Sequence, residues 1–243
     1  MTSLTRILAQ GRWETRLLLR NGEQLLLTLV IPLGLLVVLV LTDVLPQTTG
    51  GDTIAASLAT VLAVSVISTG FTSLAIATGF ERRSGALRLL ATTPLTSREL
   101  LFGKAGATVV VTVLSGGLAT LLAVILGWRP TPSALVVPVL VLLGVAAWAP
   151  WAFVLAGTLR AEAVLAVANG LFLVFLLFGG VVIPAESLPD LLGAVVPYLP
   201  SGALVEALAA SLGGAAVPAM AVGVLLAWTA LGTLVATRTF RWT

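Results

Sequence analysis

Long apolar runs alternate with short polar segments along the whole chain of 243 residues. A membrane-spanning helix needs about 20 predominantly apolar residues, and the runs are of that length. They predict six spanning helices, at residues 25–45, 54–79, 100–127, 134–158, 162–183 and 215–237. Turn-forming Gly and Pro residues interrupt the apolar pattern between several of these runs. We therefore expect an all-α polytopic membrane protein in which residues 1–243 form a single transmembrane domain.

The segment before the first apolar run has the pattern of an amphipathic helix. At 3.6 residues per turn, its apolar face would contain Leu4, Ile7, Leu8 and Leu18. The basic stripe beside that face would contain Arg12, Arg16 and Arg20, with Trp13 near its edge. This arrangement predicts an interfacial helix over residues 1–24 that lies on the inner leaflet and contacts membrane lipids. The alternative is that these charges are only a generic basic retention signal.

Residues 184–212 fit neither a spanning helix nor an ordinary loop, because the stretch is interrupted by Pro yet remains largely apolar. Backbone at membrane depth outside a full span is tolerated only where protein or a water-filled cavity satisfies it. We expect two short helices that form an outer re-entrant hairpin near a translocation pathway. The Leu residues expected to dip into the outer leaflet are Leu188, Leu191, Leu192, Leu204 and Leu208. The expected gate residues are Pro184, Glu186, Pro189, Pro197, Pro200 and Glu206.

The composition narrows the chemistry that the chain can carry out. Hydrophobic residues make up 58% of it and charged residues 9%, against about 25% charged residues in typical soluble domains. The absence of Cys and His excludes disulfides, thiolate chemistry and His catalysis or metal ligation. The apolar runs carry no acid near their middle and no paired acids, so a proton-relay transporter and an intramembrane hydrolase are both disfavoured. We expect no metal site, no catalytic residue and no nucleic-acid partner.

The distribution of basic residues sets the orientation of the predicted spans. Cytoplasmic loops of membrane proteins carry an excess of Lys and Arg. If the N-terminus is inside, every Lys and Arg of the chain falls on the cytoplasmic side except Arg129. The sequence therefore predicts six spans with both termini in the cytoplasm.

Two short motifs resemble parts of a nucleotide site without completing one. LSGG at 114–117 is followed by Leu118 and lies in an apolar run, where small residues favour close helix packing. Gly103 and Lys104 lack the upstream Gly of a phosphate-binding loop, and Ala105 stands where such a loop requires Ser or Thr. We therefore expect no ATP site in this chain.

The most specific stretch is ERRSGALRLLATTPLTSRELLFGK, residues 81–104, in the main predicted cytoplasmic loop. It resembles the first cytoplasmic loop of ABC-2 type permeases, the membrane subunits of type-2 ABC exporters. The residues that match the family pattern are Glu81, Arg82, Arg83, Gly85, Leu87, Leu89, Leu90, Thr93, Pro94, Gly103 and Lys104. The amphipathic arm, the six runs and the Pro-rich segment at 179–208 extend the resemblance over the whole chain. After Pro200, however, SGALVEALAA departs from the larger polar or basic residues of many members.

The resemblance implies a permease that works with a separate cytoplasmic ATPase. Two permease subunits, identical or related, would pair with two ABC ATPase subunits, and ATP and Mg²⁺ would bind to the ATPases. Residues 81–99 would form the coupling loop, with a helix over 81–94 seated in a groove of the ATPase. The implied coupling residues are Glu81, Arg82, Arg83, Gly85, Leu87, Arg88, Leu90 and Pro94. Leu87 and Leu90 would offer an apolar ridge, and Pro94 would stop the helix.

Within the family, the chain resembles small drug-efflux permeases of the daunorubicin type, in the bacterial plasma membrane. This resemblance predicts outward transport of a hydrophobic or amphipathic molecule such as a drug, an antibiotic or a lipid. The alternatives are a polysaccharide or glycolipid exporter, a non-transporting membrane assembly scaffold, and an intramembrane enzyme. An exporter of glycans would be expected to have more aromatic residues, and a scaffold would not need a coupling loop.

Overall fold

The structure of the protein is a computed structural model that describes residues 2–22, 26–42 and 53–240. Every regular element in these ranges is a helix, which confirms the predicted all-α class for this part of the chain. The α-helices are α1 (Ser3–Arg20), α3 (Ile31–Thr42), α4 (Thr53–Ile67), α5 (Leu74–Ser84), α6 (Ala86–Leu90), α7 (Ser97–Ile125), α8 (Val137–Thr158), α9 (Ala161–Phe178), α10 (Asp190–Val195), α11 (Pro200–Leu212) and α12 (Ala219–Thr239). The π-helical segments are η1 (Leu26–Val30) and η2 (Ser68–Ser73), and the 3₁₀ turns are η3 (Pro132–Val136), η4 (Ala185–Ser187) and η5 (Val196–Tyr198).

Five helices in the described ranges are apolar and long enough to cross a membrane, and they match the second to sixth predicted spans. They are Thr53–Ser84, Ser97–Ile125, Pro132–Thr158, Ala161–Phe178 and Ala219–Thr239. The first predicted span, 25–45, contains the shorter apolar helix Thr28–Thr42, and its predicted last residues, 43–45, lie outside the described residues. The fifth span is shorter than predicted, because its helix ends at Phe178 before two successive glycines.

The most buried of these spans consists of α4, η2 and α5, which continue one another without a break. Nearly every side chain of α4 is buried, and this helix packs against α3, α7, α8 and α11. In the middle of the span, η2 places Phe71 against Trp148 of α8, with ring centroids 5.4 Å apart. The central span is therefore enclosed by protein, whereas α9 and α12 have the smallest buried shares of the five.

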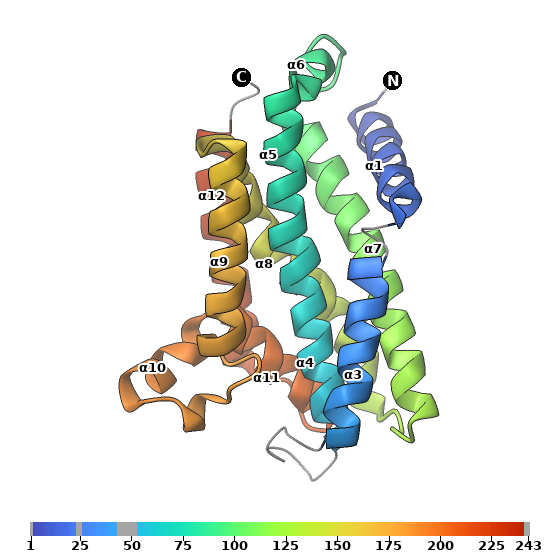
Figure 1. Ribbon diagram of the computed structural model, residues 1–243, viewed down its shortest axis with the longest axis vertical. Helices are drawn as coiled ribbons and strands as arrows, with labels where there is room; N and C mark the ends of the chain where they lie inside the picture. The colour runs from blue at the N-terminus through green and yellow to red at the C-terminus, as the bar shows by residue number, and fades with distance from the viewer. Residues whose placement is uncertain (1, 23–25, 43–52, 241–243) are drawn as a thin grey trace.

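The long helices run side by side along the longest axis of the molecule (Figure 1). One end of the bundle carries α6, the start of α1 and the end of α12. We call it the basic end, because the Arg-rich segments of α1 and of residues 82–98 lie there. The opposite end carries α10 and α11, and we call it the hairpin end. The chain passes between the two ends along α3, α4–α5, α7, α8, α9 and α12, which agrees with the predicted order of spans.

The N-terminal segment forms the predicted helix, but protein covers one side of it. α1 packs along the start of α7, where Gly11 meets Gly103 closely enough that a Cβ on Gly11 would lie 3.3 Å from the Gly103 carbonyl oxygen. In the predicted apolar face, Leu4 and Leu8 are exposed, whereas Ile7 and Leu18 are half-buried. The basic stripe, Arg12, Arg16 and Arg20, is exposed, and so is Trp13. The helix is thus amphipathic with an additional protein-facing side, and its contact with lipid stays a prediction.

The segment predicted as a hairpin, 184–212, contains two helical parts with a sharp bend between them. The first covers Asp190–Tyr198, the second begins at Pro200, and their axes differ by 74°. Leu191 in the first part is 85% exposed. The two Leu residues of α11 that were expected to face lipid, Leu204 and Leu208, are fully buried. The expectation of lipid contact is therefore wrong for α11, which packs against α4, α8 and α12 instead.

Candidate functional site

The connection between α5 and α7 has a different shape from the predicted one. α5 extends to Ser84, Gly85 follows with φ +81°, and the separate short helix α6 covers Ala86–Leu90. Gly adopts this left-handed conformation without the penalty that a Cβ imposes, and it commonly ends helices in this way. The prediction of one helix over 81–94 is therefore wrong: Gly85 interrupts it, and Pro94 lies in the turn after α6.

α6 projects at the basic end of the bundle, and its exposed side differs from the predicted ridge (Figure 1). Leu87 is fully buried and Leu90 is half-buried, whereas Leu89 is 72% exposed. The prediction that Leu87 and Leu90 form an exposed ridge is therefore wrong for this conformation. The large exposed side chains of α6 are instead Arg88 and Leu89, which we call the exposed tip.

Near the basic end, a Lys side chain lies between two Glu side chains from different helices. Lys104 Nζ of α7 is 2.8 Å from Glu14 Oε1 of α1 and 2.6 Å from Glu81 Oε2 of α5. The Lys104 side chain is 3% exposed, and that of Glu14 is 11% exposed. Gln10 Nε2 also donates a hydrogen bond of 2.7 Å to Glu14 Oε1. We call Glu14, Glu81 and Lys104 the charge cluster; it ties α1, α5 and α7 together.

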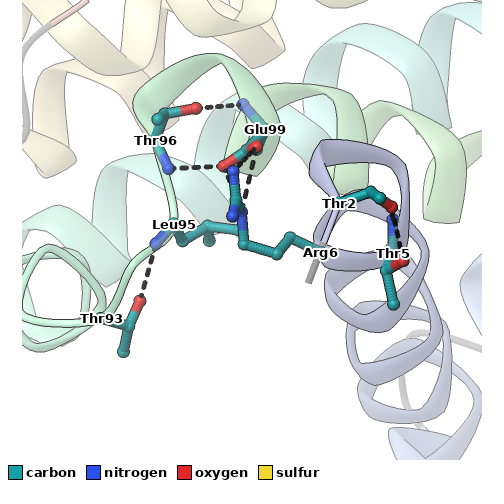
Figure 2. A network of polar contacts seen from close by, with 7 residues as sticks. All are labelled: Thr2, Thr5, Arg6, Thr93, Leu95, Thr96 and Glu99. Atoms are coloured by element: carbon teal, nitrogen blue, oxygen red, sulfur yellow. Dashed lines mark hydrogen bonds and ion pairs between the residues drawn. The ribbon is translucent and has the colours of Figure 1, made fainter.

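A second ion pair joins α1 to the first turn of α7, as Figure 2 shows. Arg6 donates to Glu99 Oε1 from Nε at 3.1 Å and from Nη2 at 2.6 Å. Glu99 also accepts a 2.9 Å hydrogen bond from the backbone N–H of Thr96, and the Thr96 hydroxyl accepts one from the Glu99 N–H. This reciprocal capping box fixes the start of α7. The hydrogen bonds that Arg6 donates to Glu99 raise the pKa of its guanidinium.

The two Arg residues at the end of α5 contact the connection between α8 and α9. Arg82 Nη2 donates to the backbone carbonyl of Leu159 at 2.5 Å, and Arg83 forms an ion pair with Glu162 of α9. Three residues of the resemblance, Glu81, Arg82 and Arg83, thus contact helices or loops of this chain. They anchor the base of the α5–α7 connection to α1, α7, α8 and α9.

Sequence reasoning missed the roles of Glu14 and Glu99 and did not predict an ion pair for Lys104, which it named only as a cytoplasmic charge and as part of two motifs. The available signal for Glu99 was the spacing Thr96-x-x-Glu99, which is the capping-box pattern at a helix start. No comparable local pattern connects Arg6 to Glu99, because the two residues are 93 positions apart. The clusters at the basic end are products of the tertiary fold.

The close contact of α1 with α7 makes a substitution at Gly103 informative. A Cβ at this position would lie 2.7 Å from Gln10 Cγ and 3.3 Å from the backbone nitrogen of Gly11. We expect Gly103→Leu to detach α1 and to increase the rate of tryptic cleavage at its Arg residues several-fold, because cleavage requires the helix to open. Gly106→Leu is the matched control, since a Cβ there meets no atom within 4 Å. Equal cleavage rates in the two variants would contradict this account of the contact.

At the hairpin end, the predicted gate residues surround a cavity of about 730 Å³. Four of them line it: Pro184, Glu186, Pro197 and Glu206. The other two lie at helix starts, since Pro189 precedes α10 and Pro200 opens α11. Val196 packs against Gly180 and Gly202, at positions where a Cβ on either glycine would collide with it. The cavity therefore has a closely packed edge between η5 and α11.

Two small residues of the LSGG motif, Ser115 and Gly116, have a packing role, as predicted, whereas a Cβ on Gly117 would meet no atom within 4 Å. Gly116 lies in the middle of α7, and a Cβ there would be 3.0 Å from Leu62 of α4. Ser115 Oγ donates a 2.7 Å hydrogen bond to the backbone carbonyl of Thr28. These contacts bring three helical segments close together, as small residues commonly do between membrane helices.

An all-helical bundle of membrane-spanning length, with an ion-paired connection at one end and a bent helix pair at the other, defines a multi-pass membrane protein. Residues 24–238 match the family described as ABC-2 family transporter protein, and the chain belongs to this family. Members are transmembrane permease subunits of ABC transporters, which are not themselves catalytic and typically work with ATPase partners. The sequence matches no curated protein. Helix α1 lies outside the matched residues.

Proposed function

We propose that this permease subunit belongs to an ATP-driven exporter and is coupled to its ATPase through the exposed tip, Arg88 and Leu89. The observation that carries the proposal is the contrast between the tip and the base of the same connection. The tip is exposed, while Glu81, Arg82 and Arg83 at the base pair with α7, with the connection after α8 and with α9. Displacement of the tip would be passed to several spans at once, since coupling travels through contiguous packed and hydrogen-bonded groups.

In this proposal the basic end faces the cytoplasm of a bacterial cell, and both termini lie there. The distribution of Lys and Arg along the chain supports this orientation in the plasma membrane. Two ABC ATPase subunits would bind ATP and Mg²⁺ and would dock on the connections at this end. An apolar Leu89 beside a cationic Arg88 suits a groove with an apolar floor and an acidic rim.

A second permease subunit, identical or related, would complete the translocation pathway. Support for a partner comes from α9, which has the smallest buried share of the candidate spans. Asn169 lies at the middle of this helix and is exposed, and its amide Nδ2 donates to the Leu165 carbonyl at 2.8 Å. A polar side chain exposed at mid-span is more favourable against protein or a water-filled pathway than against lipid.

The substrate would be a hydrophobic or amphipathic molecule, such as a drug, an antibiotic or a lipid, moved outward as in daunorubicin-type permeases. Export of a polysaccharide or glycolipid, or a scaffold role without transport, are the alternatives. A scaffold differs in one measurable respect, because its association with an ATPase would not depend on the exposed tip.

The coupling proposal predicts that a change confined to the exposed tip will separate the two subunits. The double variant Arg88→Glu and Leu89→Asp places two acids where the proposal requires a cation and an apolar side chain. We expect copurification with the partner ABC ATPase to fall at least tenfold, which corresponds to about 1.4 kcal/mol. Substrate-dependent ATP hydrolysis should fall with it.

The matched control is Arg129→Glu, which makes the same charge reversal at an exposed Arg in the connection after α7, at the opposite end of the bundle. Both variants should insert in the membrane and elute as the wild-type chain does, because none of the substituted residues is buried. If the tip variant retains its ATPase while inserted normally, the exposed tip is not the coupling contact.

A further inference from the structure

The cavity at the hairpin end has the size and the composition of a small-molecule site. Its volume of about 730 Å³ lies within the range of roughly 300–1,000 Å³ that is usual for ligand pockets. One face of α11 forms a wall, with lining residues Gly202, Val205, Glu206, Ala209 and Ala210 at helical spacing. Most of the remaining lining is apolar and comes from α4, residues 180–185 and residues 215–220.

The hydroxyl of a largely buried Thr that lines the cavity lacks a hydrogen-bond partner within the described protein. Thr60 of α4 lines the cavity, is 4% exposed, and has no hydrogen-bond partner among the described residues. A buried polar group without a partner is unfavourable, so a ligand or water in the cavity would satisfy it. This hydroxyl points to a ligand independently of the charged residues of the cavity.

The charged residues that line the cavity are both acidic. Glu186 and Glu206 contribute their side chains, no Lys or Arg is among the lining residues, and neither carboxylate has an ion-pair partner in the described parts of the chain. Asp190 lies in the same hairpin, and Arg129 is the one basic residue in the described connections of this end. The local potential therefore favours a cation.

An aromatic residue also lines the cavity. Tyr198, the single Tyr of the chain, lines the cavity and is 61% exposed. Its backbone carbonyl accepts a 2.9 Å hydrogen bond from Trp228 Nε1, which fixes the position of this residue against α12. An exposed aromatic face attracts cations through its quadrupole and also contacts apolar groups.

We infer that the cavity binds an amphipathic organic cation, with the charge near Glu186 and Glu206 and the apolar part against α4 and α11. The inference rests on the proposed function, which it narrows to a cationic class of substrate at the outward-facing side of the pathway. Anionic lipids and glycans with acidic groups would be repelled by the two carboxylates. Neutral apolar molecules would gain nothing from them.

Binding to the purified full-length chain in nanodiscs tests the inference without any ATPase. The probe is tetraphenylphosphonium, and tetraphenylborate serves as an anion of nearly the same shape. We expect saturable binding of the cation that is weakened roughly three- to fivefold by Glu206→Gln and roughly tenfold by the double variant with Glu186→Gln. Asp190→Asn, a carboxylate removal in the same hairpin but outside the cavity, should weaken the affinity less than Glu206→Gln does.

Three results would overturn the inference. They are the absence of saturable cation binding to the wild type, equal binding by the double variant, and equal saturable binding of tetraphenylborate. If cation binding follows these expectations but the tip variant keeps its ATPase, the coupling proposal fails and the site stands. If the tip controls ATPase binding but the Gln variants bind the cation normally, the cation site fails and the coupling proposal stands.

Discussion

Replacing Lys104 with Met should destabilise the bundle more than removal of any exposed basic side chain at the same end. Lys104 is buried between Glu14 and Glu81, and no other Lys or Arg forms an ion pair with either in the described residues. Removing one partner of a buried ion pair leaves an uncompensated charge and typically costs about 3–5 kcal/mol. The measurement is the thermal unfolding midpoint of the detergent-solubilised chain, followed by Trp fluorescence.

Two further variants separate this effect from a general loss of positive charge. Arg98→Met removes an exposed charge from the same helix and should change the midpoint little. A triple variant, with Lys104→Met combined with Glu14→Gln and Glu81→Gln, removes the uncompensated charges and should recover much of the loss. If Lys104→Met and Arg98→Met unfold at the same temperature, the charge cluster does not stabilise the fold.

The second large effect is expected from Gly202→Ala at the start of α11. A Cβ at this position would collide with the backbone carbonyl oxygen of Val196, and a backbone atom cannot move aside as a flexible side chain can. Overpacking of this kind typically costs about 1–3 kcal/mol. We expect η5 to be displaced from α11. This displacement would open the closely packed edge of the cavity, and we expect it to abolish transport.

Gly223→Ala is the matched control for this substitution, because a Cβ on Gly223 of α12 meets no atom within 4 Å. The displacement can be measured by labelling a single Cys introduced at Val195, which needs no further changes since the chain contains no Cys. Faster labelling in the Gly202→Ala background than in the Gly223→Ala background is the expected result. The same labelling rate in both would show that the hairpin adapts to the added methyl group.

Hydropathy predicted the order of the spans well, because the requirement for about 20 apolar residues acts on each segment by itself. The errors arose where a conformation depended on one residue or on a distant partner. The helix that was predicted to reach Pro94 ends at Ser84 instead, because Gly85 adopts the left-handed backbone conformation that commonly terminates a helix. Leu87 was predicted to be exposed because it lies three residues before Leu90. Its burial instead follows from the position of α6 in the fold.

The candidate sites were predictable to different degrees for the same reason. The acidic and Pro-rich character of the hairpin is a property of one continuous segment, so Glu186 and Glu206 could be named in advance. Their position around a common cavity could not, because α4 supplies one wall from more than a hundred residues earlier in the chain. The charge cluster likewise needs three helices that are adjacent only in the folded bundle.

The long sequence separation between α1 and its partners has a consequence for biosynthesis. Arg6 leaves the ribosome 93 residues before Glu99, and at about 5–20 residues per second this interval lasts roughly 5–20 s. During that time Glu14 and Arg6 have no α7 to bind, while Leu4, Leu8 and the Arg stripe are already present. The nascent helix is thus suited to rest on the membrane surface first, and to exchange that contact for α7 once the third span has been inserted.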